Sequence, residues 1–207
     1  IYLEQVMNVP VQISKWIPIP FQISALIGLQ VWSIYSNKKG RISALNRGGI
    51  IWIFACLIAM LLPPLSTNID PQNLLSINNI ESLKMFSLIF IILLVGFGAS
   101  TAYLIPWSLL PDAIDQDPER PAGIYTAWMV LIQKIGIGLS VLILGLLLSF
   151  AGYKSNCSEL INCIGQPSTA IITIRICMGL IPTGLVAIGL GIMQPWKNKL
   201  NLTRKLN

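Results

Sequence analysis

The sequence predicts an all-α transmembrane protein with about five membrane-spanning helices. Hydrophobic residues make up 54% of its 207 residues and charged residues only 11%, whereas soluble domains carry about 25% charged residues. The mean hydropathy is +0.72. Apolar stretches of about 20 residues, the length that crosses a hydrocarbon core of about 30 Å, recur along the chain. Such segments must be helices, because isolated strands would leave backbone groups unpaired in lipid.

Five apolar segments reach or approach that length. The predicted spans are residues 11–35, 48–65, 85–110, 122–152 and 168–196. Pro18 and Pro20 predict an irregular turn at the entry to the first span, and Pro106 predicts a bend within the third. Lys134 alone interrupts the fourth span. Arg175 lies near the start of the fifth, where a long side chain could reach the interface.

The basic residues are divided unequally between the two sides that five spans define. One side carries nine of them, namely Lys38, Lys39, Arg41, Arg47, Arg120, Lys197, Lys199, Arg204 and Lys205. The other side carries four, namely Lys15, Lys84, Lys154 and Arg175. The positive-inside rule makes the first side cytoplasmic, so we expect an integral protein of the plasma (inner) membrane with a cytoplasmic C-terminal tail. Because this topology accounts for the net charge of +6, no nucleic-acid partner is expected.

The chain begins at Ile1 and shows no basic leader or small-residue cleavage site typical of a signal peptide. The number of spans is odd, which fits a truncated bundle better than a complete one. We therefore expect residues 1–207 to be part of a longer membrane protein.

The residue types argue against an enzyme. The sequence contains no histidine, which excludes HExxH zinc sites and Ser/His or Cys/His nucleophile pairs. The four cysteines have no metal-ligand spacing, and Cys56 and Cys177 are expected to pack within apolar spans. Cys157 and Cys163 share one loop and could form a disulfide if that loop faces an oxidising compartment. No metal and no cofactor are expected.

Lys134 is the residue that points most strongly to a function. It lies near the middle of the fourth predicted span, where a lysine costs roughly 2.5–3.5 kcal/mol to insert. We therefore expect its ammonium group to face an acidic partner or a water-filled cavity. It could serve a coupling ion or a solute there, or it could form a purely structural ion pair.

Several neighbours of Lys134 are candidates for the same cavity. On a helix, Thr126 and Gln133 lie beside the face that carries Lys134. Tyr125 and Trp128 could line the cavity or could simply pack against other helices. These four residues are therefore predicted only as a possible cavity lining.

Asp112 and Asp115 are three residues apart and share a helix face if the third span continues one turn beyond Pro111. They lie on the side where basic residues are expected, and we interpret them as members of ion pairs across the cytoplasmic mouth. A solvated polar turn is the alternative, and it describes Asp117 and Glu119 well. The candidate basic partners are Lys38, Lys39 and Arg41, or helices that lie outside these residues. Pairs that form in one conformation and break in another could act as a gate.

The segment PWSLLPDAIDQD, followed about twenty residues later by a lysine-centred, glycine-rich helix, resembles one family. It is similar to the glycoside-pentoside-hexuronide:cation symporters, the melibiose-permease branch of the major facilitator superfamily, whose relatives include sodium-dependent lysophospholipid transporters. In that family the tenth helix ends in a W-S-x-x-x-D-x-x-D-like run. The matching residues here are Trp107, Ser108, Asp112 and Asp115. The eleventh helix carries a lysine near the cation site and closes with Gly-Tyr, matched here by Lys134, Gly152 and Tyr153.

The resemblance implies that residues 1–207 are the C-terminal part of a major-facilitator transporter domain, its helices 8–12. It thereby implies part of a cation-coupled symporter that works by alternating access. The solute would be small, a sugar or a related compound. The coupling ion, Na⁺ or H⁺, would be bound mainly by an N-terminal half of the same transporter. That half, the lipid bilayer and the solute are the expected partners. The resemblance also places Lys134 near the ion site. A non-transporting membrane scaffold or a lipid-handling membrane protein is the alternative.

Overall fold

A computed structural model describes residues 1–65, 80–119, 121–154 and 166–206, with the side chains of 196–206 left aside. The elements are η1 (Tyr2–Val6, a π-helical turn), α1 (Val11–Ser14), α2 (Pro18–Lys39), α3 (Arg41–Leu61), α4 (Ile80–Asp115), α5 (Ala122–Phe150), α6 (Ser168–Met178) and α7 (Leu180–Leu206). Within these residues, five stretches are long and apolar enough to cross a membrane: Val11–Lys39, Arg41–Leu61, Ile80–Asp115, Ala122–Phe150 and Ser168–Pro195. The predicted fold class is therefore confirmed.

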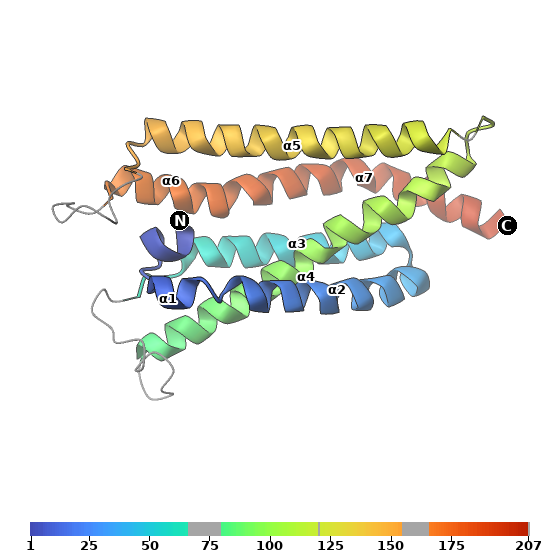
Figure 1. Ribbon diagram of the computed structural model, residues 1–207. Coiled ribbons are helices and arrows are strands. Elements are labelled where there is room, and N and C mark those ends of the chain that lie inside the picture. Colours follow the sequence, from blue (N-terminus) through green and yellow to red (C-terminus); the bar gives the residue numbers. More distant parts are fainter. Residues whose placement is uncertain (66–79, 120, 155–165, 207) are drawn as a thin grey trace.

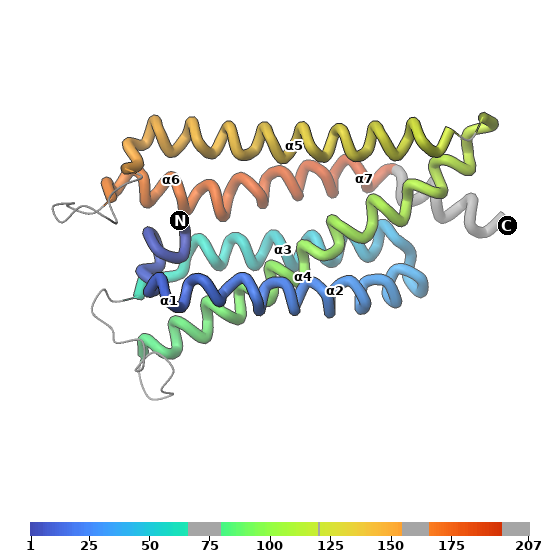
Figure 2. Tube along the Cα trace, viewed as in Figure 1, coloured from blue at the N-terminus to red at the C-terminus, as the bar shows by residue number. Residues whose placement is uncertain are grey.

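Helix α4 crosses the bundle diagonally. Helices α2 and α3 lie side by side, and α4 runs across them (Figure 1). Helix α4 makes its most extensive contacts with α2 and α3, and α7 packs mainly on α3. The tube in Figure 2 shows that α4 leads from α2 towards the start of α5. Helix α5 has only smaller contacts, with α4 and α6, and is therefore the least covered of the long helices in the described part of the chain.

Small residues allow α4 to cross its neighbours closely. A methyl group added at Gly98 would lie 2.7 Å from the backbone nitrogen of Trp52 on α3, and one added at Gly96 would lie 2.6 Å from the carbonyl oxygen of Phe21 on α2. Close approach through glycine is a common way for membrane helices to associate, because lipid provides no hydrophobic drive between them. The crossing point is therefore intolerant of larger side chains.

We name the two ends of the bundle by their residues. The end that holds Lys39, Arg41, Asp115 and Ala122 is called the basic end, and the end that holds Leu61 and Phe150 is called the opposite end. At the opposite end, residues of η1, α3, α4 and α6 form a buried apolar cluster that includes Met7, Leu88 and Ile174. At the basic end, Trp32, Ala44 and Ile105 form a smaller cluster. The opposite end therefore carries most of the described core.

The ends of the helices differ from the predicted spans. Residues 36–47 lie between the first two predicted spans, and all of them except Gly40 are helical. Gly40 has a φ of 92°, which only glycine adopts readily. Helix α3 ends at Leu61 because Pro63 and Pro64 follow. Helix α4 continues through Pro111 to Asp115. At the basic end, polar residues extend the helices beyond the apolar stretches. Hydropathy shows which part of a helix can face lipid, not where the helix begins or ends.

Candidate functional site

An ion pair at the basic end joins two helices. Gly40 turns the chain so that Arg41 opens α3, and α4 carries Asp112 in its last turn. Nη1 of Arg41 and Oδ2 of Asp112 form a hydrogen-bonded ion pair. The two side chains are 37% and 43% exposed, so water screens the attraction and the pair is weak. A weak pair of this kind can open and close without a large energetic cost.

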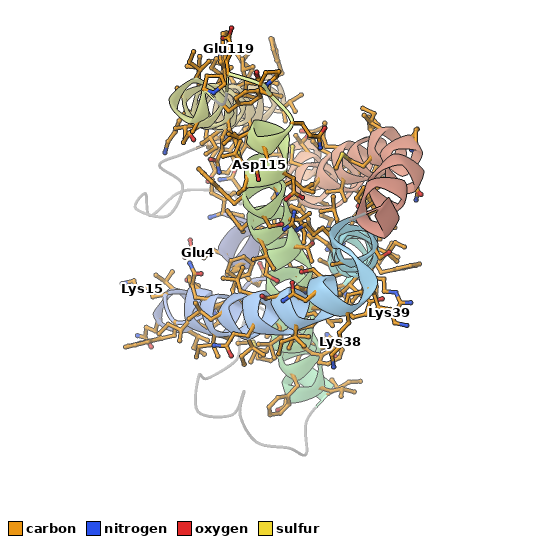
Figure 3. All side chains as sticks on the ribbon, turned by 90° about the vertical axis from the view of Figure 1, so that its right-hand side faces the viewer. Glu4, Lys15, Lys38, Lys39, Asp115 and Glu119 are labelled. Carbon is orange, nitrogen blue, oxygen red and sulfur yellow. The ribbon has the colours of Figure 1, made fainter. Side chains whose placement is uncertain are left out.

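The other charged residues at the basic end are less constrained. Figure 3 shows Lys38 and Lys39 at the end of α2 and Asp115 on α4. The ion pairs among the described residues include none of the three. Arg47 lies over the ring of Tyr35, 5.1 Å from its centroid, in the geometry of a cation–π contact. Of the two predicted gate residues, only Asp112 thus has a basic partner within the part of the chain that the structure describes.

Asp117 organises the turn between α4 and α5. Its Oδ1 accepts a hydrogen bond from the backbone N–H of Glu119 at 3.1 Å, and its Oδ2 accepts one from the hydroxyl of Tyr125 at 3.0 Å. Asp117 was expected to be an ordinary solvated residue, and Tyr125 a cavity or packing residue. The structure instead joins Asp117 in the turn to Tyr125 in the first turn of α5.

Lys134 lies on an exposed surface of α5. It takes part in no ion pair among the described residues, and α5 has one buried residue, Leu148. Thr126, Trp128 and Gln133 are also exposed, and the hydroxyl of Thr126 donates to the carbonyl oxygen of Ala122 at 2.9 Å. The described helices therefore leave the face that carries Lys134 uncovered.

A cavity of about 430 Å³ lies between α3, α4 and α7. Its lining consists mainly of apolar side chains. The lining residues are Leu45, Gly49, Trp52, Thr101, Ala102, Ile105, Pro106, Leu109, Val186, Gly189, Leu190 and Met193. The hydroxyl of Thr101 donates to the carbonyl oxygen of Gly98 at 2.8 Å, so it is already used within α4. The predicted cavity residues of α5 do not contribute to this lining.

The remaining predictions concern cysteines and metals. Cys56 is buried and Cys177 is partly exposed, and both are free thiols. Cys157 and Cys163 lie outside the described residues. Among the described residues, no group of three or more Asp, Glu or Cys side chains could hold a metal ion.

The sequence did not predict two hydrogen bonds at the opposite end. Nη1 of Arg175 donates to the carbonyl oxygen of Met60 on α3 at 3.1 Å, whereas the sequence suggested that its side chain would extend to the membrane interface. The hydroxyl of Tyr2 donates to the carbonyl oxygen of Ala59, the residue before Met60. A backbone carbonyl has no sequence signature, so only the fold could reveal these partners.

Comparison with known proteins places the chain among transporters. It is 29% identical over 189 residues to an uncharacterized symporter from Synechocystis sp., covering 89% of this chain and 31% of that protein. It is 37% identical over 102 residues to sodium-dependent lysophosphatidylcholine symporter 1 from Gallus gallus, covering 46% of this chain and 18% of that protein. It is 27% identical over 180 residues to symporter 1-A of the same description from Danio rerio, covering 84% and 29%.

The matched region is therefore at most about a third of the length of these relatives. Residues 2–196 match the family described as MFS/sugar transport protein. Nearly the whole chain is covered by this match, and the five candidate spans agree with it. The chain therefore belongs to the MFS/sugar transport protein family of the major facilitator superfamily.

Proposed function

We propose that the full-length protein is a cation-coupled symporter and that this chain supplies five spans of one half of it. The observation that carries the proposal is the similarity, over 89% of the chain, to a protein named as a symporter. Solute and ion would bind between two halves that rock against each other, as in related secondary transporters. The bilayer and the other half of the transporter would then be the partners of these helices.

We assign the ion pair between Arg41 and Asp112 to the gate of this transporter. It joins the ends of α3 and α4. Because both helices belong to the same half, the gate would open by a local separation of these two ends that accompanies the rocking of the halves. Its exposure keeps the cost of breaking it low, which suits a contact that forms and opens in each cycle. Asp115, one turn further along α4, would find its partner in the other half of the transporter. The side that bears this gate would be cytoplasmic by the positive-inside rule.

Lys134 would act at the interface with that other half. An ammonium group at this depth is unfavourable against lipid, and the described helices leave its face uncovered. Covering α5 with the other half of the transporter would give Lys134 a polar environment. There its positive charge would compete with the coupling cation for the same acidic groups, and this competition would make solute movement depend on the ion. Sodium is the ion named in two of the relatives.

For the solute, we propose a single-chain lipid such as lysophosphatidylcholine. Two relatives carry that substrate in their names. The cavity between α3, α4 and α7, within this half, has an almost entirely apolar lining, which would suit the hydrocarbon chain of a lipid whose head group lies between the halves. A sugar buried there would leave hydroxyl groups without partners, and each would cost free energy. A sugar is the second candidate, because the family itself is described by sugar transport.

Uptake by cells that express the full-length protein distinguishes the two solutes. Radiolabelled lysophosphatidylcholine and radiolabelled melibiose are offered separately, in sodium buffer and in choline buffer. We expect sodium-dependent uptake of the lipid alone. Sodium-dependent uptake of melibiose alone would establish the sugar. Uptake of neither, by protein present at the cell surface, would favour the alternative of a scaffold.

A further inference from the structure

The C-terminus of α3, at the opposite end of the bundle, is capped by side chains from two other segments. The last four carbonyl groups of a helix lack helical donors, and in α3 these belong to residues 58–61. The hydroxyl of Tyr2 in η1 donates to the carbonyl of Ala59, and Nη1 of Arg175 in α6 donates to that of Met60. Two neighbouring carbonyls are thus satisfied by side chains that come from both ends of the chain.

The residue that follows α6 touches Met60 a second time, one turn further on. Gly179 follows Arg175 by four residues, so both lie on the same side of the helix. A methyl group added at Gly179 would lie 2.7 Å from Cβ of Met60. Gly179 is also buried. The side of α6 that faces α3 is therefore defined by one hydrogen bond and one close contact, both at Met60.

The fifth span is interrupted at this contact. Gly179 separates α6 from α7, and Pro182 in the first turn of α7 has no N–H to donate to the carbonyl of Met178. The hydroxyl oxygen of Thr183 is buried and has no hydrogen-bond partner among the described residues. The N–H groups of Gly179 and Thr183 still donate to the carbonyls of Arg175 and Gly179, at 2.9 and 3.3 Å, but the bond that residue 182 would donate to Met178 is missing, so the helix is weakened where α6 meets α7.

Arg175 forms no ion pair among the described residues, and its one described hydrogen bond goes to a neutral carbonyl. Burial raises the pKa of the Tyr2 hydroxyl, and the nearby charge of Arg175 opposes that rise. A charged donor on a neutral acceptor is stronger than an ordinary hydrogen bond but weaker than a buried ion pair. Such a contact can hold a segment in place and still be released.

We propose that Arg175 is a positioning residue that fastens α6 to the end of α3, and that the weakened stretch between Gly179 and Pro182 lets α6 move independently of α7. Helix α6 would then be a short mobile segment at the opposite end of the bundle. This inference does not depend on the transported solute or on the coupling ion. It concerns only the fifth span, in which α6 can be released from α3 while α7 stays in place.

Hydrogen exchange of the full-length protein in detergent, followed by mass spectrometry, tests the proposal. Arg175→Met removes the donors and keeps an apolar stem. We expect the amides of residues 168–178 to exchange about tenfold faster, as for the loss of one hydrogen bond from a charged donor. The amides of 184–192 in α7 should stay within about twofold of the wild type, because they lie beyond the interruption.

Two further variants separate this effect from a general loss of structure. Ile172→Met places the same residue on an exposed position of α6 and should leave exchange unchanged. Arg175→Lys keeps a charged donor and should restore most of the protection. Equal acceleration in α6 and α7, or no acceleration in Arg175→Met, would overturn the proposal. If Arg175→Met does not fold, the wild type still tests it, since α6 and α7 must exchange as separate units; a single cooperative unit across Gly179 would contradict the inference.

Discussion

The ion pair between Arg41 and Asp112 permits a quantitative test of the proposed gate. Both side chains are more than a third exposed, and exposed pairs contribute about 0.2–1 kcal/mol. This energy corresponds to a change of about 1.4- to 5-fold in the equilibrium between closed and open ends. Removing either partner should therefore open the basic end slightly and should leave the fold intact. The effect should shrink in high salt, because exposed charges are screened.

The assay follows a cysteine at position 108 in a full-length protein whose native cysteines are replaced. Ser108 lies one turn before Asp112 on the same face of α4, so a cysteine there reports on access through the gate. Asp112→Asn and Arg41→Gln should each raise its alkylation rate, from the side of the basic end, by about 1.4- to 5-fold. The double variant should show no further increase, because the second change removes nothing more.

Glu119→Gln is the matched control. Glu119 is an exposed acid in the turn after α4 and takes part in no ion pair among the described residues, so its neutralisation should leave alkylation unchanged. Exchanging the charges, Arg41→Asp with Asp112→Arg, should restore the wild-type rate. The reasoning is refuted if Glu119→Gln acts like Asp112→Asn, or if the effects of the two single variants simply add.

Three other predictions follow. Gly98→Ala should lower the melting temperature in detergent, since its methyl group would lie 2.7 Å from a backbone nitrogen of α3 and overpacking costs about 1–3 kcal/mol; Gly136→Ala, with no atom within 4 Å, should not. The wild type should lose stability at alkaline pH when Tyr2 ionises, and Tyr2→Phe should not show this loss. Burial raises the pKa of Tyr2 against the opposing charge of Arg175, so its contribution is full below about pH 10 and is lost as pH rises through the raised value; equal alkaline unfolding of both proteins would contradict this. Lys134→Gln should abolish sodium-driven solute accumulation while the protein still reaches the membrane, and retained accumulation would exclude Lys134 from coupling.

Hydropathy was sufficient to predict the five spans, because the length of an apolar stretch is set by the thickness of the bilayer. It did not predict where the helices end. The two helices that meet at Gly40 continue through polar residues. These residues can lie in water at the membrane surface, so hydropathy does not mark them as part of a span. Arg41 was one of three basic candidates for Asp112, and only the fold shows which of them reaches it.

The other partners in the fold could not be read from residue types. Arg175 and Tyr2 bind backbone carbonyls, and every residue has a carbonyl, so no pattern distinguishes the acceptor. The bond between Tyr125 and Asp117 depends on how a short turn is folded. The environment of Lys134 depends on what covers α5, which these helices do not supply, so its role in coupling stays a prediction.

Sodium-driven uptake in proteoliposomes tests the central claim most directly. The purified full-length protein is reconstituted, and accumulation of labelled lysophosphatidylcholine in the inner leaflet is followed with and without an inward sodium gradient. Our account predicts accumulation that requires the gradient and stops when an ionophore dissipates it. Equal movement of the lipid with and without the gradient would contradict a cation-coupled symporter.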